Sequence, residues 1–386
     1  MSTAKRRGNH EGSTPVKRAD GRWQVHVRYR DEHGVPQRTT VYGKTPREAR
    51  DKAEEVRRRL RAHLPAKDKK ITLGAFAESW ITSTLAASDR KPSTKSLYAT
   101  LARKHIIGAK LGAQPLDRLK PSHVEAWKVE LKGRGLSDST IRSAFNALKA
   151  ILDTAVRDEA LARNVATSVT RPKATRYEAA FLTPEEVRRL LEAASATRHA
   201  ALFAFLVNTA LRRGEALALR WSDVNLDARV LRVRGTLARV DGTLIVTEPK
   251  TTKSRRSVPL SAAVERVLRE VRTIQAADRL RAGSAWQQTG YVFTTQLGEP
   301  CDPRNVLRAL KAVAKRAGLG DIGLHTLRHS AAAVMLVNGV PLKVVSEVLG
   351  HASIGITGDI YGHVSPDVSR DALARLSEAL GDKRWS

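Results

Sequence analysis

Hydrophobic and polar residues alternate with a period of two over residues 23–30, near the start of the chain. Tryptophan, valine and tyrosine take one set of positions, and glutamine, histidine and arginine take the other. This alternation predicts a half-buried β-strand, followed by a turn at 31–34 and a second strand over 38–42. Thr45 is followed by proline and, three residues on, by glutamate, which is typical of a capped helix start. We therefore expect a small sheet with one helix.

The pattern changes after residue 70, because apolar residues then recur every three or four positions as far as residue 170. This period is that of amphipathic helices, and we expect four or five of them in an all-α domain. Ser122 lies three residues before Glu125 and is expected to cap one of these helices.

A third pattern begins at Thr183, where threonine, proline and two glutamates again predict a helix start. Helical and alternating stretches are mixed beyond it, and the remainder is expected to be helical to near the C-terminus. The predicted elements are a buried helix over 200–211 and strands over 230–234, 244–246 and 257–260, joined by turns at 241–242 and 251–256.

Together these patterns predict an α+β protein that is mostly helical. Charged stretches that contain proline, at 63–70 and 171–176, are typical of linkers. The expected division is a flexible basic arm over 1–20, a sheet domain over 21–64, a helical domain over 71–170 and a mixed domain with a C-terminal tail helix over 177–386.

The composition favours a polyanionic partner. Lysine and arginine total 68 against 39 aspartate and glutamate, a formal net charge of +29 that is spread along the chain. Cys301 is the single cysteine, which excludes an intrachain disulfide and a thiolate metal cluster. The start is basic and polar, unlike a secretory signal, and no apolar run approaches the ~20 residues of a membrane helix. We expect a cytoplasmic protein that binds nucleic acid and not a membrane.

Cations at positions predicted to be exposed are candidate DNA contacts. Each by itself is more often a solvated surface residue, but the set favours a DNA-binding surface. The candidates are Arg28, Arg30, Lys95, Arg103, Lys104, Arg142, Lys149, Lys253 and Arg255.

Six residues in the second half of the chain have the chemistry of a phosphodiester site. Two guanidiniums supply planar forks for phosphate oxygens, a phenol supplies an oxygen nucleophile, and an ammonium and two imidazoles accompany them. These residues are Arg212, Lys250, His325, Arg328, His351 and Tyr361.

The spacing of these residues groups some of them. Arg212 and Glu215 are three apart on a predicted helix, and His325 and Arg328 repeat that spacing on a second one. Taken alone, the first pair is more often an exposed ion pair. Lys250 begins a cationic turn and could donate a proton to a leaving oxygen, although the sequence leaves Lys253 open as the donor.

Neither a metal nor a nucleotide cofactor is expected. His325 and His329 have the spacing of a zinc-binding helix, but no glutamate follows the first histidine. No glycine-rich phosphate loop is present in the sequence. The chemistry is therefore expected to need no cofactor.

Tyr361 is expected to lie on a weakly held helix. Ser353 can cap that helix, and Gly355 and Gly358 each cost about 1 kcal/mol relative to alanine. We infer that this segment docks only when DNA or a partner subunit is present.

Residues 181–365 resemble the catalytic domain of the tyrosine recombinases, in the phage-type integrase branch. Four motifs stand in the order of that family: TALRRGEALALRWSDVNLD, EPKTTKSRRSVPL, HTLRHSAA and LGHASIGITGDIYGH. Residues 71–170 are similar to the family's helical core-binding domain. Residues 20–62 are similar to its arm-type DNA-binding domain, which has a three-stranded sheet.

The resemblance implies a role for each site residue. Tyr361 would attack the scissile phosphate and form a 3′-phosphotyrosyl link, which frees a 5′-hydroxyl. Arg212 and Arg328 would neutralise the non-bridging oxygens, and Lys250 would protonate the leaving oxygen.

The supporting roles follow in the same way. His325 would assist proton transfer, His351 would hydrogen-bond the phosphate, and Glu215 would orient the other groups. Two positions depart from the family's pattern: Ala210 replaces a common glycine, a change expected to tighten helix packing. Gly358 replaces a frequent apolar residue, which bears on the docking of the Tyr361 segment.

The family's usual assembly implies further partners. These are double-stranded attachment-site DNA, a homotetramer that exchanges strands through a Holliday junction, an excision factor and a host DNA-bending protein. Residues 367–380 carry an apolar stripe that packs either within the chain or on a neighbouring subunit. Two other functions stay open, a type IB-like topoisomerase and a catalytically inactive DNA-binding regulator.

Overall fold

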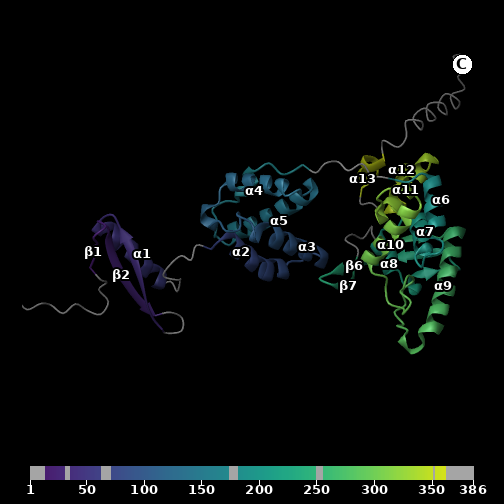
Figure 1. Ribbon diagram of the computed structural model, residues 1–386, viewed down its shortest axis with the longest axis horizontal. Helices are drawn as coiled ribbons and strands as arrows, with labels where there is room; N and C mark the ends of the chain where they lie inside the picture. Colours follow the sequence, from purple (N-terminus) through teal and green to yellow (C-terminus); the bar gives the residue numbers. More distant parts are fainter. Residues whose placement is uncertain are drawn as a thin grey trace, which may run out of the picture. The chain divides into compact units, whose positions relative to one another are not determined.

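The computed structural model describes residues 14–30, 35–61, 71–173, 181–248, 255–350 and 353–361 (Figure 1). The chain divides into two compact units, one of residues 1–88 with 98–174 and the other of residues 89–97 with 175–386. The elements are mostly helices with small antiparallel sheets, so the predicted fold class is confirmed.

The N-terminal elements form a three-stranded antiparallel sheet with one helix, as predicted. Val25 and Val27 are buried against Ala49 and Ala53 of the helix. His26, between the two valines, points to the other face of the sheet. The elements are β1 (Val16–Lys17), β2 (Trp23–Arg30), β3 (Pro36–Gly43) and α1 (Pro46–Arg61), with strand order β1-β2-β3.

The cap of α1 differs in one bond from the predicted capping box. The Glu48 N–H donates to Thr45 Oγ1 at 3.1 Å, as expected. The Glu48 carboxylate, however, accepts the backbone N–H of Lys44 at 2.7 Å.

The next part of the chain is all-α, as predicted. Its helices pack around a core that includes Trp80, whose Nε1 donates to Thr154 Oγ1 at 3.0 Å. The elements are α2 (Leu73–Trp80), α3 (Pro92–Ala102), α4 (Pro121–Gly133) and α5 (Asp138–Arg157), π-helical turns at Ile81–Leu85 and Arg103–Ile107, and short 3-10 helices at Leu116–Arg118 and Val165–Ser168.

The predicted cap at Ser122 is wrong. Helix α4 begins at Pro121 and its N-cap is Lys120, so Ser122 already lies in the first turn. Proline at the first helical position has a fixed φ and no N–H to satisfy, and it sets this boundary.

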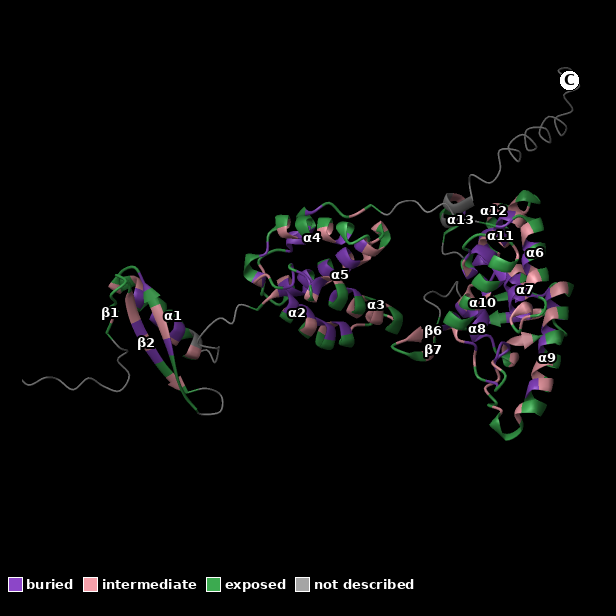
Figure 2. Ribbon diagram, viewed as in Figure 1, coloured by how far each residue is buried: buried purple, intermediate pink, exposed green. Residues whose placement is uncertain are grey.

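The C-terminal unit packs helices around α7, most of which is buried in Figure 2. The capping box at Thr183 and Glu186 forms as predicted. The helices are α6 (Pro184–Ala194), α7 (Ala200–Thr209), α8 (Arg213–Ala218), α9 (Ala262–Ala282), α10 (Pro303–Arg316), α11 (Leu324–Val337), α12 (Leu342–Leu349) and α13 (Ile354–Tyr361), with 3-10 turns at Trp221–Asp223 and Gly283–Ala285.

The strands of this unit form two separate sheets, one of three strands and one of two, whereas the sequence pattern predicted strands joined one after another by turns. The turn at Asp241 and Gly242, both at positive φ, joins β7 to β6, a strand that the sequence pattern did not predict. β5 pairs instead with β4 and β8. The strands are β4 (Val224–Asn225), β5 (Val230–Val233), β6 (Thr236–Val240), β7 (Thr243–Thr247) and β8 (Arg256–Pro259).

Ala210 is the C-cap of α7 and adopts a left-handed conformation, with φ 52° and ψ 21°. That alanine here tightens helix packing stays a prediction, and the left-handed backbone is a feature that the sequence pattern did not predict. A left-handed residue other than glycine costs about 1–2 kcal/mol, and this conformation explains why glycine is common at the position.

Within the described segments, no helix combines the length and the apolar character needed to cross a membrane.

Candidate active site

Arg212 and Glu215 lie at the start of α8. Arg212 is the N-cap residue, with extended backbone, so it precedes the helix instead of lying within it. Glu215 accepts the Arg212 backbone N–H at 3.0 Å and its Nη1 at 2.8 Å. Leu217 and Leu219 are buried and anchor α8 in the core. Because Glu215 is only 5% exposed, the interpretation of this pair as an exposed ion pair is wrong.

A third residue, Arg256, completes this cluster. Its Nη2 donates to Glu215 Oε2 at 3.0 Å, and its Nη1 donates to Oε1 at 3.3 Å. Arg256 falls in the predicted turn 251–256, but that boundary is wrong: Arg256 is the first residue of β8 and pairs with Val233 of β5. It therefore shares the inward face with Val258. The alternation of Arg256 with the buried Val258 was the signal in the sequence that could have identified Arg256 as an inward-facing residue.

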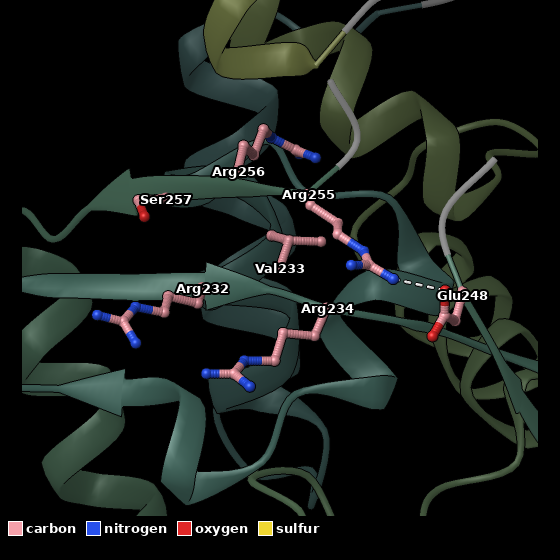
Figure 3. Close-up of a pocket in the computed structure, with 7 residues that line it drawn as sticks. All are labelled: Arg232, Val233, Arg234, Glu248, Arg255, Arg256 and Ser257. Atoms are coloured by element: carbon pink, nitrogen blue, oxygen red, sulfur yellow. Dashed lines mark hydrogen bonds and ion pairs between the residues drawn. The ribbon is translucent and has the colours of Figure 1, made fainter. Parts of the chain in front are cut away.

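The outward faces of the same strands form a cationic pocket of about 490 Å³ (Figure 3). Arg232 of β5 and Arg234, the residue that follows this strand by one position, line it together with Arg255, which directly precedes β8. Arg255 forms an ion pair with Glu248 at 2.5 Å. Arg256 extends away from Arg232 and Arg234, so that its guanidinium lies apart from theirs.

Glu215 is held in its charged form. Burial by itself would raise the pKa of this carboxyl, but hydrogen bonds and charge from Arg256 and then Arg212 outweigh burial and lower the pKa. The site thus contains one buried carboxylate between two guanidiniums.

Arg328 is almost fully buried on α11, at 3% exposure. Its Nη1 donates to the Ala210 carbonyl at 2.7 Å, and its Nη2 donates to the Leu349 carbonyl at 2.6 Å. These carbonyls lie at the C-terminal ends of α7 and α12, where the helix dipole is negative. Two helix ends therefore compensate the burial of this charge.

Arg212 reaches the same end of α12. Its Nη2 donates to the carbonyl of Gly350 at 3.2 Å, next to the carbonyl that Arg328 binds. Gly350 is the left-handed cap that ends α12. Residues 212 and 328, far apart in sequence, are thus brought together.

His325 lies one turn before Arg328 on α11 and keeps an exposed ring. Its pKa is lowered, first by partial burial and then by the charges of Arg328, Arg213 and Arg212. The imidazole therefore favours the neutral form, which can accept a proton. His329 follows one turn later, with ring centroids 6.4 Å apart, and burial lowers its pKa to about 4.

Four other predicted residues, a tyrosine, two lysines and a histidine, are not described with their side chains. Lys250, Lys253 and His351 lie outside the described residues. Tyr361 is the last residue of α13, and its side chain is not described. Helix α13 contacts α12, and the Ser353 hydroxyl accepts the Gly355 N–H at 3.2 Å, which confirms the predicted cap.

The candidate DNA contacts differ in their surroundings. Arg28, Arg30, Lys104 and Lys149 are exposed, whereas Lys95 and Arg142 are half-buried. Arg103 forms an ion pair with Glu78 at 2.8 Å, as Arg255 does with Glu248. Their contact with DNA remains a prediction.

No group of three histidine, cysteine or acidic side chains in the described part of the chain is arranged to hold a metal ion.

Comparison with known proteins supplies the context for this geometry. Residues 180–367 match the Phage integrase family. The chain is 34% identical over 370 residues to a Tyrosine recombinase XerC-like protein of Caldanaerobacter subterraneus subsp. tengcongensis, covering 90% of this chain and 94% of the relative. It is 26% identical to the ICEBs1 integrase of Bacillus subtilis, covering 94% and 99%.

Among solved structures, the fold is similar to that of the Tn1549 transposon integrase, which was solved in complex with transposon right end DNA. The TM-score is 0.65 at 23% identity, and the match covers 79% of this chain and 99% of the integrase chain.

Proposed function

This chain belongs to the tyrosine recombinases, in the phage integrase family, and from that premise we propose that it integrates or excises a mobile element by site-specific DNA recombination. It would cut and rejoin DNA through a 3′-phosphotyrosyl intermediate on Tyr361. The observation that carries this proposal is the convergence of the Arg212 and Arg328 guanidiniums on one helix end, with His325 beside them.

The two guanidiniums would stabilise the negative charge that develops on the non-bridging oxygens as phosphorus is attacked. Fixed cations are effective here because they need not reorganise during the reaction. Arg212 is held by Glu215 and Gly350, yet about a third of its side chain remains exposed, at 34%. It can therefore meet a phosphate that approaches from solvent.

The covalent step balances without a cofactor. The Tyr361 oxygen forms a bond to phosphorus, the bond from phosphorus to the 5′ oxygen breaks, and that oxygen leaves as a hydroxyl. Neutral His325 would take up the phenol proton, and Lys250 would supply the proton to the leaving oxygen. His351 would hydrogen-bond the phosphate. Attack by a 5′-hydroxyl reverses the step, since the phosphotyrosyl bond keeps the energy of the phosphodiester.

We propose attachment-site duplex DNA as the substrate and a homotetramer on two such sites as the assembly. An excision factor and a host DNA-bending protein are proposed as further partners. The net charge of +29 supports the choice of DNA, because each neutralised phosphate releases counterions.

The test is the mapping of the covalent adduct. A nicked duplex taken from the element's own integration junction should trap the wild-type protein, and mass spectrometry should locate the DNA on Tyr361. Tyr361→Phe should bind the same duplex and form no adduct.

Two outcomes would point to other functions. A Tyr361→Phe variant that keeps all biological activity would identify a DNA-binding regulator. Relaxation of a supercoiled plasmid that lacks the junction sequence would identify a topoisomerase.

A further inference from the structure

Arg256 is a buried cation that the proposed mechanism does not use. Its side chain is 10% exposed, and both of its terminal nitrogens donate to the Glu215 carboxylate. Its Nε is buried without a hydrogen-bond partner among the described residues. An arginine buried at this cost is held in place by its acidic partner.

Glu215 transmits the position of Arg256 to Arg212. One carboxylate binds Nη1 of Arg212 at 2.8 Å and its backbone N–H at 3.0 Å while it accepts both bonds from Arg256. Without Arg256, the carboxylate would keep only one guanidinium and could rotate toward it. The orientation of Arg212 therefore depends on both arginines.

Arg256 also packs over the second support of Arg212. A Cβ added to Gly350 would lie 2.8 Å from the Arg256 Cζ, so the guanidinium occupies the space beside this glycine. The carbonyl of the same Gly350 accepts Nη2 of Arg212 at 3.2 Å. Arg256 thus contacts both groups that fix Arg212, the carboxylate and the end of α12.

We propose that Arg256 is a positioning residue, which orients the Arg212 guanidinium for the scissile phosphate through Glu215 and Gly350. This inference rests on the proposed function. It links β8 to the proposed phosphate-binding arginines, so that β8 and the start of α8 keep one arrangement.

Arg256→Met tests this role, because methionine fills most of the space and removes the guanidinium. Single-turnover adduct formation at saturating DNA should fall by about 10–100-fold, the range for groups that support a functional residue. DNA affinity should stay close to that of the wild type. Arg256→Lys should give an intermediate rate, since one ammonium cannot bind both carboxylate oxygens in the same way.

A double-mutant cycle identifies the route of the effect. In a Glu215→Gln background, Arg256→Met should slow adduct formation far less than it does in the wild-type background. Equal losses in the two backgrounds would mean that Arg256 does not act through Glu215.

The chain offers a matched control for a merely structural role. Glu265 is also buried and lies between two arginines, Arg229 at 2.9 Å and Arg269 at 3.1 Å, on α9 and away from the site. Arg269→Met also removes one of two arginines from a buried carboxylate, although the Arg269 side chain is 61% exposed and that of Arg256 only 10%. It should leave the rate of adduct formation unchanged.

The outcomes separate this inference from the proposed function. If the wild type forms no adduct on Tyr361, the proposed function fails. If the wild type forms the adduct and folded Arg256→Met forms it at the same rate, only the role of Arg256 is overturned. Should Arg256→Met fail to fold, Arg256→Lys decides: a wild-type rate overturns the role, and a reduced rate at unchanged affinity supports it.

Discussion

Arg212 and Arg328 donate to the carbonyls of two consecutive residues, Gly350 at 3.2 Å and Leu349 at 2.6 Å. The end of α12 therefore acts as a shared acceptor for both guanidiniums. Their relative position is set before any phosphate arrives, which is what electrostatic preorganisation requires.

Arg328→Lys should impair both folding and cleavage. A lysine ammonium cannot span the carbonyls of Ala210 and Leu349, and one buried acceptor left unsatisfied costs about 1–3 kcal/mol. Cleavage should fall about 10²–10³-fold, as for the loss of one transition-state donor. Urea unfolding and single-turnover adduct formation measure the two effects.

Arg316 provides a control for this substitution. Its Nη2 donates to the Ala193 carbonyl near the end of α6 at 2.8 Å, but at an exposed position. Arg316→Lys should therefore change stability by less than about 0.5 kcal/mol. Equal losses in the two variants would contradict the importance of burial.

Stability should decrease as the pH falls from about 6.5 toward 4, and His329 should contribute to the decrease. Burial and the charges of His325 and Arg328 lower its folded pKa to about 4 from the ordinary histidine value of 6.5. Between these values the unfolded chain binds more protons, so the contribution is complete above 6.5 and is lost toward pH 4.

NMR titration of the His329 ring and urea unfolding at several pH values check this prediction. His329→Gln should show a shallower loss of stability than the wild type. Glu215 acts in a different pH window: its pKa lies below the ordinary value of 4.5, so its contribution to stability is complete above pH 4.5 and is lost as the pH falls further. A measured His329 pKa near 6.5 would contradict the prediction.

Gly358→Ala should stabilise α13 by about 1 kcal/mol, since alanine forms helix more readily than glycine. There is room for the methyl group, because the closest atom to an added Cβ is Leu342 Cδ2 at 3.9 Å. Amide hydrogen exchange in 354–361 should slow about fivefold. Full protection of 353–363 in the free wild-type monomer would refute the weakly held nucleophile segment.

Lys250→Ala should slow cleavage of normal DNA and leave cleavage of a 5′-phosphorothiolate substrate fast. A thiolate leaves without a proton, so a general acid is then unnecessary. Lys253→Ala is the comparison variant. If the phosphorothiolate substrate restores cleavage only in Lys253→Ala, Lys253 is the proton donor.

Binding to attachment-site DNA should weaken steeply with salt. Each phosphate neutralised by the protein contributes about 0.9 to the slope of log K against log salt. Equilibrium binding measured between about 50 and 200 mM salt gives that slope. Affinity that is flat over this range would contradict a surface of net charge +29.

Local patterns predicted much of the fold. The alternation over 23–30 corresponds to β2, and the capping box at Thr183 starts α6. Ser353 caps α13, as its position before the predicted helix indicated. The prediction at Ser122 failed because a proline one residue earlier had already set the first turn.

The residue types of the candidate site can also be read from the sequence, because two arginines, a lysine, two histidines and a tyrosine stand in four recognisable motifs. By itself it determined which local elements form, since helix periods, strand alternation and caps depend on residues only a few positions apart. It did not determine which side chains meet.

Only the tertiary structure decided which of these side chains come into contact. Arg256 reaches Glu215 across 41 positions, Arg328 reaches Ala210 across 118, and Arg212 reaches Gly350 across 138. These bonds depend on how helices and strands pack around α7, and packing joins residues without regard to their separation along the chain. The left-handed turn at Ala210 and the inward side chain of Arg256 are set in the same way.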